Sequence, residues 1–201
     1  QLVAINAATT GAITLDVKNG ALNDTAANLS AAFAGTITTY TGDITVSDAA
    51  TIAQLTALGS ATSGTVSHSA LSDTAANLVP SGTISNKVTS NYTVTVTDQA
   101  TVAQLVAINA ATTGAITLST VTGALSDTAA NLAAAFAGTI TTYTGGVTVT
   151  DQATVTQLVA INNAVSGAIT LDTVSGALSD TAANLAAAFA GTITTYTGGV
   201  T

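Results

Sequence analysis

The chain contains no cysteine, methionine, tryptophan, arginine or glutamate among its 201 residues. Without cysteine, disulfides, thiol nucleophiles and thiolate metal ligands are all excluded. Ten aspartates and two lysines give a net charge of −8, and only 6% of the residues are charged. Two lysines cannot neutralise a phosphate backbone, so nucleic acid is excluded as a partner. A polybasic contact with anionic lipid fails for the same reason.

Apolar residues are nevertheless abundant. They make up 47% of the chain, and the mean hydropathy is +0.55. Acidic disordered segments lack this apolar content, so a folded core is expected. No apolar run reaches 18 residues without a polar interruption, so no membrane insertion is predicted.

The chain is built from repeated phrases. QLVAIN begins at Gln1, Gln104 and Gln157, and AGTITTYTG recurs around Tyr40, Tyr143 and Tyr196. The sequence therefore predicts a single domain over 1–201, made of long repeats at approximately 1–48, 49–98, 99–151 and 152–201. Because the chain starts and stops inside repeated phrases, it is expected to be a segment of a longer array.

Each long repeat divides into two related halves of about 25 residues. The half that starts at Asp127 begins with an alanine-rich stretch in which Leu132 and Phe136 lie four apart, which is typical of a helix. It ends with Val147 and Val149 alternating with threonine, which is typical of a strand. The sister half has a longer predicted helix over 151–167 and a strand over 168–176.

Helices that alternate with strands at this short, fixed spacing favour parallel strands joined by helical connections. The predicted fold is an α/β repeat solenoid of about eight βα coils, with parallel β-sheet rungs and short stacked helices. One coil holds too few large apolar side chains to fold alone, so its neighbours are expected to complete its core.

An aspartate marks the start of almost every half-repeat. These residues are Asp24, Asp48, Asp73, Asp98, Asp127, Asp151 and Asp180. The favoured interpretation is helix capping, with Ser126 or Asp127 as the cap in the third long repeat. Calcium binding is the alternative, but calcium needs six to eight oxygens in a tight cluster, and no EF-hand or GGxGxD pattern is present.

No enzyme is predicted, and no catalytic, cofactor-binding or metal-binding residue is assigned. His68 is the sole histidine and has no second histidine or cysteine beside it in sequence. Phe33, Phe136, Phe189 and the three repeated tyrosines are expected to stack in the core or at its rim. Residues 79–92, which contain Pro80 and Lys87, depart most from the repeat and are expected to form a local irregularity or a seam.

Threonine-rich segments such as TITTYT and TVTVT could present rows of hydroxyls on a strand face. Ice-binding solenoids use regular threonine arrays, so ice binding is one hypothesis, and glycan or calcium binding on the same face or the Asp row are others. The simpler interpretation is that threonine suits an exposed strand.

The phrases LSDTAANL, VTVTDQATVAQL and INAATTGAITL resemble the tandem arrays of very large bacterial surface and secreted proteins, of cyanobacterial and proteobacterial type. The resemblance covers essentially the whole chain and implies an extracellular or cell-surface location. It also implies a structural role as a stalk, sheath or filament, with end-to-end self-association. The alternative function is a binding or adhesion module with a surface glycan as its partner.

Overall fold

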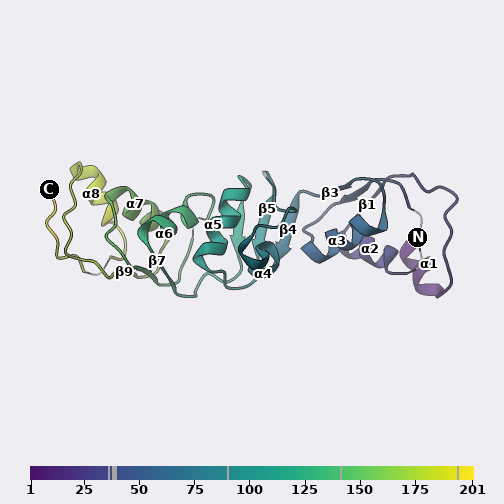
Figure 1. The fold of residues 1–201 in the computed structure, drawn as a ribbon, viewed down its shortest axis with the longest axis horizontal. Coiled ribbons are helices and arrows are strands. Elements are labelled where there is room, and N and C mark those ends of the chain that lie inside the picture. The colour runs from purple at the N-terminus through teal and green to yellow at the C-terminus, as the bar shows by residue number, and fades with distance from the viewer. Residues whose placement is uncertain (36, 38–39, 90, 141, 194) are drawn as a thin grey trace. The chain divides into compact units, whose positions relative to one another are not determined.

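The protein has an α/β fold with small parallel sheets, as shown by a computed structural model that describes residues 1–35, 37, 40–89, 91–140, 142–193 and 195–201 (Figure 1). Over these residues it contains eight α-helices and one 3₁₀ helix. The chain divides into two compact units, Gln1–Asp73 and Thr74–Thr201. Each unit is described by itself.

The first unit alternates short helices with shorter strands. Its helices pack in chain order, α1 against α2 and α2 against α3. In sequence order its elements are α1 (Leu2–Ala8), β1 (Leu22–Asp24), α2 (Ala26–Phe33), β2 (Ile44–Val46), α3 (Ile52–Ala61), β3 (Val66–Ser67) and β4 (Ala70–Asp73).

The second unit continues the same alternation. Helices α4 to α8 again pack in chain order, each against the next. The elements are α4 (Ala75–Leu78), the 3₁₀ helix η1 (Pro80–Gly82), β5 (Thr93–Val96), α5 (Val102–Ala111), β6 (Ile116–Leu118), β7 (Leu125–Asp127), α6 (Ala129–Phe136), β8 (Val147–Val149), α7 (Val155–Ala164), β9 (Ile169–Leu171) and α8 (Ala182–Ala188).

Strand pairing is parallel and keeps one register throughout. Leu22 pairs with Ile44 and Ile44 with Val66, so partners are 22 residues apart. The same offset joins β5 to β6, β7 to β8 and β8 to β9. The prediction of parallel strands joined by helical connections is confirmed. The spacing that the backbone uses in these strands is 22 residues rather than about 25.

The longer spacing in the sequence comes from a five-residue insertion that lies outside the paired strands. It occupies residues 16–20, 119–123 and 172–176. In the second copy, the N–H groups of Thr144 and Gly145 both donate to the Val121 carbonyl, at 2.9 and 2.7 Å. The insertion therefore forms a turn on which the next stretch of chain rests, and a new sheet starts after it at β7.

The core is formed by the inward residues of the strands and one face of each helix. In β2 and β8 the outer two residues are buried and the central threonine is not. Leu132, Leu158 and Ile161 on α6 and α7 are at most 1% exposed. This pattern follows from the alternation of side chains along a strand and the 3.6-residue period of a helix.

The helices begin at a different residue from the one predicted. Thr128 is the N-cap of α6, and its hydroxyl accepts from the Asn131 N–H, so the expectation of Ser126 or Asp127 as the cap is wrong. A threonine also caps α2, α3, α4, α5, α7 and α8. Three of these form capping boxes with a glutamine, at Thr51, Thr101 and Thr154.

Residues 79–92 form a local irregularity, as expected. Helix α4 ends at Leu78 because Pro80 disfavours helical backbone in the residue before it, and Val79 has φ −126° and ψ 69°. Ser81 and Gly82 then adopt positive φ values of 53° and 80°. The segment is tied down by Ser85 N–H, which donates to the Leu78 carbonyl at 2.8 Å, and by burial of Val88.

Among the described residues, no helix combines the length and apolar character needed to cross a bilayer. The interpretation of residues 1–201 as one continuous array stays a prediction.

Candidate functional site

Four of the repeated aspartates join one helix to the next stretch of chain. The carboxylates of Asp48, Asp98 and Asp151 each accept from the N–H of the first residue of the preceding helix, at 2.7 Å. Asp73 accepts from the Ile52 N–H in the same way, at 2.8 Å. A carboxylate at a helix start also interacts favourably with the helix dipole. These aspartates therefore act at the helix that lies 21–23 residues before them.

The remaining three aspartates act within their own half-repeat. Asp24, Asp127 and Asp180 accept from the N–H of the next residue, at 2.7–2.8 Å. Each also accepts from the side-chain amide of an asparagine four residues later, at 2.8 Å. The asparagine bond and then the backbone bond hold the pKa of Asp24 and of Asp180 below the ordinary value of 3.8.

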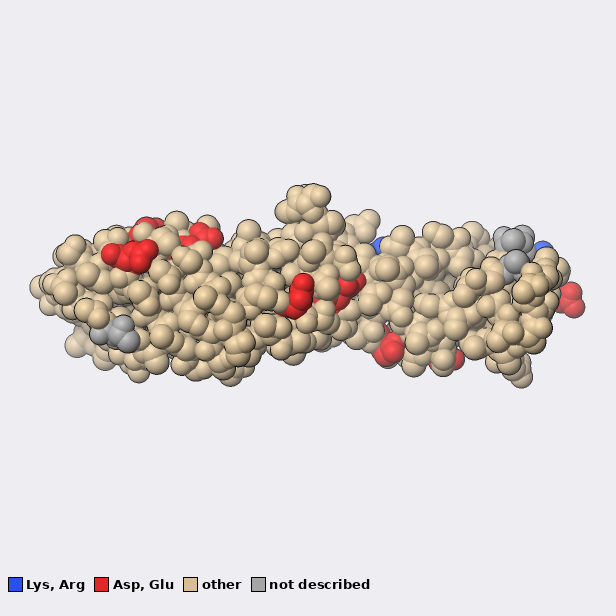
Figure 2. Space-filling model, turned by 90° about the horizontal axis from the view of Figure 1, so that it is seen from below, with Lys and Arg blue, Asp and Glu red and all other residues tan. Residues whose placement is uncertain are grey.

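The aspartates are dispersed over the described surface rather than gathered. Figure 2 shows separate acidic side chains among uncharged neighbours. Over the residues with defined positions, no three His or Asp side chains come together as a group that could hold a metal ion. His68 is half-buried and follows β3. Calcium binding along the Asp row stays untested.

A ladder of glycines runs through each unit at the same 22-residue spacing. Gly42 follows Gly20, Gly145 follows Gly123, and Gly198 follows Gly176. A Cβ atom on Gly145 would lie 2.0 Å from the Gly123 carbonyl oxygen, and one on Gly167 would lie 2.2 Å from that of Gly145. Such separations are far inside van der Waals contact, so glycine is required for the backbones to approach this closely. We call these residues the glycine ladder.

Tyrosine and threonine hydroxyls bond across the same corner. The Tyr143 hydroxyl donates to the Gly123 carbonyl, and Tyr40 and Tyr196 do the same to Gly20 and Gly176. Thr62 and Thr112 take the equivalent place in other half-repeats and donate to carbonyls 20 residues earlier, at 2.7 and 2.6 Å. Each hydroxyl satisfies a backbone acceptor that the turn leaves unpaired within the sheet.

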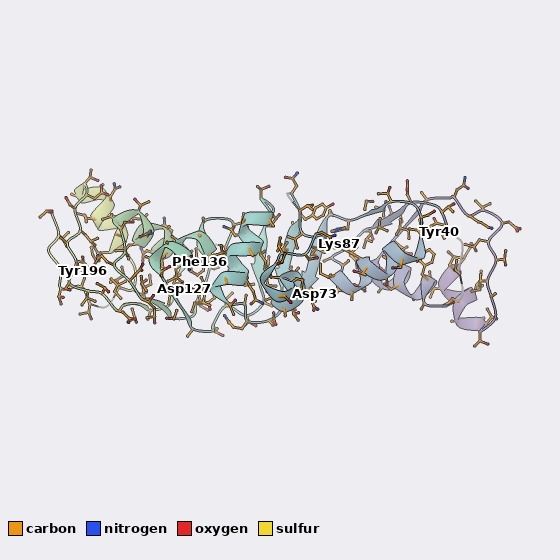
Figure 3. The ribbon with its side chains drawn as sticks, viewed as in Figure 1. Tyr40, Asp73, Lys87, Asp127, Phe136 and Tyr196 are labelled. Atoms are coloured by element: carbon orange, nitrogen blue, oxygen red, sulfur yellow. The ribbon has the colours of Figure 1, made fainter. Side chains whose placement is uncertain are left out.

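The aromatic residues are core residues, as predicted. Phe136 and Tyr143 have ring centroids 5.6 Å apart at 50°, and the Phe33–Tyr40 and Phe189–Tyr196 pairs repeat this geometry. Figure 3 labels Phe136 on α6, with Asp127 at the start of that helix. Tyr143 is fully buried, and this burial raises its pKa, while the Gln99 amide that donates to its oxygen lowers it.

An asparagine in the longer helices forms a third set of bonds. The side-chain amides of Asn6, Asn109 and Asn162 donate to carbonyls in the following helix, at 3.0, 2.9 and 3.1 Å. A Cβ atom on Gly35, Gly138 or Gly191 would lie at most 1.7 Å from these asparagine side chains. The glycine that ends each shorter helix therefore also makes room for the asparagine. We did not predict this contact, although the phrases QLVAIN and AAFAG recur together in the sequence.

The threonine-rich face is a single column of hydroxyls. Thr148 lies in register between Ser126 and Thr170, and Thr45 lies between Asn23 and Ser67. The hydroxyls of Thr45 and Ser67 are 3.1 Å apart, within hydrogen-bond distance. Much of the TITTYT phrase falls on residues 36, 38–39, 141 and 194, which lie outside the described residues.

Two equivalent grooves lie at the starts of α5 and α7. They have volumes of about 350 and 320 Å³. One is lined by Gln99, Thr101 and Asp127, and the other by the matching Gln152, Thr154 and Asp180. They arise where the insertion separates β7 or residue 178 from the preceding helix, so they are a product of the repeat.

No protein-family model matches the chain, and neither a curated protein nor a solved structure matches it.

Proposed function

We propose that the protein is a structural repeat protein, an α/β-solenoid of about eight coils that forms an extracellular stalk, sheath or filament by axial stacking. The observation that carries this proposal is the constant 22-residue offset between paired strands. An element that repeats at one offset adds the same contacts at each step and extends along one axis.

The chemistry of the contacts between half-repeats supports the same role. The bonds of Asp151, Asn162 and Tyr143 all end on backbone N–H or carbonyl groups of a neighbouring half-repeat. Backbone acceptors and donors are present in every copy, so these contacts tolerate sequence drift elsewhere. Their side chains are committed to holding neighbouring copies together.

The surface charge fits an extended assembly that stays dispersed. With ten aspartates and two lysines, parallel rods of this protein would repel one another sideways. The placement outside a bacterial cell rests on the resemblance of the repeated phrases to surface arrays. Labelling of intact source cells with an antibody raised against the chain tests it, and a signal that appears only after lysis argues against it.

Fibre diffraction from concentrated, aligned protein tests the structural role. We expect rods whose strands lie across the long axis, with a meridional reflection near 4.8 Å. Strands that run along the axis, or a failure to form any rod, would contradict the proposal. Electron microscopy of the same sample shows independently whether the particles are rods.

The second candidate function is a binding or adhesion module, and the in-register hydroxyl column favours it. Evenly spaced Ser126, Thr148 and Thr170 could bind glycan or ice, and the Asp row could bind calcium. Calorimetry with calcium, thermal melts with and without chelator, and thermal hysteresis distinguish these ligands. An unchanged melting temperature on chelation and no hysteresis leave the structural role.

A further inference from the structure

The same 24-residue sequence occurs twice in the second unit with different surroundings. Residues 125–148 and 178–201 are identical. In the first copy Leu132 and Val147 are at most 1% exposed, whereas in the second copy Leu185 is half-buried and Val200 is 47% exposed. The difference arises because residues 157–171 cover the first copy, with α7 packed on α6 and β9 paired with β8.

The covering sequence is also present at the start of the chain. Residues 1–16 match residues 157–172 at all but three positions. Ile5 corresponds to Ile161, and it is 47% exposed where Ile161 is fully buried. None of the residues of α1 is buried. The chain thus carries both halves of an interface that its own interior shows in assembled form.

We infer that a second copy of this chain binds through its residues 1–16 to residues 178–201 of the first, as α7 and β9 bind to α6 and β8. This inference rests on the proposed axial stacking and specifies its contact. Helix α1 of one copy packs on α8 of the other, and Ile13 takes the place that Ile169 holds beside Val147, now beside Val200. Ile5 becomes buried in the joint.

The internal interface also predicts the backbone bonds of the joint. Within the chain, Tyr143 N–H donates to the Ala164 carbonyl, and Ser166 N–H donates to the Tyr143 carbonyl, both at 2.8 Å. The equivalent bonds would join Tyr196 of one copy to Ala8 and Thr10 of the next. The contact is between unlike surfaces, so each added copy exposes a fresh end, and the assembly stays open rather than closing as a dimer.

The joint between copies is weaker than the internal interface for a specific reason. Residues 149–156 precede the covering sequence inside the chain, and they supply Asp151, which accepts from Ala129 N–H, and the Thr154 capping box. Helix α1 has no side-chain cap. Adding the sequence VTDQATVT before Gln1 should therefore lower the concentration at which copies assemble.

Analytical ultracentrifugation of the 201-residue chain tests the joint. We expect the average mass to rise with concentration without a plateau at the dimer. Ile5→Asp should raise the midpoint concentration for assembly by at least about tenfold, because burial of an isoleucine is lost and a charge would enter the contact. Thr14→Asp is the matched control, since Thr14 and its counterparts Thr117 and Thr170 are all exposed, and it should assemble like the unmodified chain.

Mixing two blocked variants tests the polarity. Ile5→Asp leaves residues 178–201 available, and Val200→Asp leaves residues 1–16 available. Each variant alone should stay monomeric, and an equimolar mixture should stop at a dimer. Far-UV circular dichroism verifies that both variants are folded.

The outcomes separate the two proposals. An unmodified chain that stays monomeric at all concentrations would overturn both the joint and axial stacking. An unmodified chain that assembles equally well with Ile5→Asp and Val200→Asp would overturn the joint alone. A mixture of the two variants that remains monomeric, beside an unmodified chain that assembles, would also overturn the joint.

Discussion

The half-repeats that begin at Asp73 and Asp127 share the phrase DTAANL and then diverge. After Asp127 the chain forms an eight-residue helix and places Tyr143 under the corner of the sheet. After Asp73 the helix has four residues and gives way to a 3₁₀ turn, and tyrosine is absent from the matching place. The insertion 119–123 precedes the regular half-repeat, whereas the divergent one follows Val66–Asp73 without an insertion.

The comparison shows that the insertion and the tyrosine act as a pair. Gly123 at the end of the insertion supplies the carbonyl that accepts from the Tyr143 hydroxyl. The other two insertions end in Gly20 and Gly176, and a tyrosine follows each by 20 residues. Without the insertion there is no such carbonyl, and the following half-repeat closes through local turns instead.

The largest expected effect comes from breaking the glycine ladder of the regular half-repeat. Gly145→Ala places a Cβ atom 2.0 Å from the Gly123 carbonyl oxygen, so the backbones must separate. We expect the free energy of unfolding to fall by about 3 kcal/mol, measured by urea denaturation. Gly146→Ala is the control, because its Cβ would have its closest contact at 3.8 Å. Equal losses from both variants would show that close approach is not the cause.

The tyrosine half of the pair should contribute less. Tyr143→Phe removes the hydroxyl that bonds to the Gly123 carbonyl and to the Gln99 amide. We expect the free energy of unfolding to fall by about 1–2 kcal/mol, since a buried carbonyl loses its donor. Tyr196→Phe should cost less in the same urea titration, because Tyr196 is half-buried and water can replace the hydroxyl.

A smaller effect of opposite sign is expected in the divergent half-repeat. Ser81 has φ 53°, a region that costs a non-glycine residue free energy. Ser81→Gly should therefore raise the free energy of unfolding by about 0.5 kcal/mol after the added flexibility of the unfolded chain is counted. Thr83→Gly, at φ −108°, should lower it. A stability loss in Ser81→Gly would mean that its side chain matters more than its backbone.

The smallest effect is a dependence on pH at the aspartate–asparagine pairs. The pKa of Asp24 and of Asp180 is lowered in the folded protein, so folded protein binds fewer protons than unfolded protein in that range. Their contribution is present above the ordinary value of 3.8 and is lost as the pH falls through the lower folded value. Thermal melts between pH 6 and pH 2 should show a smaller fall for Asp180→Asn than for the unmodified chain.

Strand chemistry and direction were accessible from the sequence, and the residue that starts each helix was less so. Alternating Val147 and Val149 predicted β8, and the short spacing predicted parallel pairing. The cap was assigned to Asp127 because aspartate is an equally good cap in isolation. What decides against it is the helix of the neighbouring half-repeat, which takes Asp151 at the same structural position, and a neighbour is not visible in local sequence.

The contacts between half-repeats left a signal that spacing analysis could have found. Gly123, Gly145 and Gly167 recur every 22 residues, and each repeated tyrosine lies 20 residues after a glycine. Counting from aspartate to aspartate hid this period, since the insertion at 119–123 lengthens that interval without entering a strand. The division at Asp73 and Thr74 has no comparable signal, as the phrase DTAANL crosses it unchanged.

The constant offset between partners also bears on how the chain acquires its structure. Each paired strand finds its partner across a loop of about 22 residues, and the closure entropy of such a loop is nearly the same at every step. Contacts this close in sequence favour rapid folding. A nucleus that forms anywhere along a unit should then grow in both directions, and extra copies would lengthen the structure without slowing its first step.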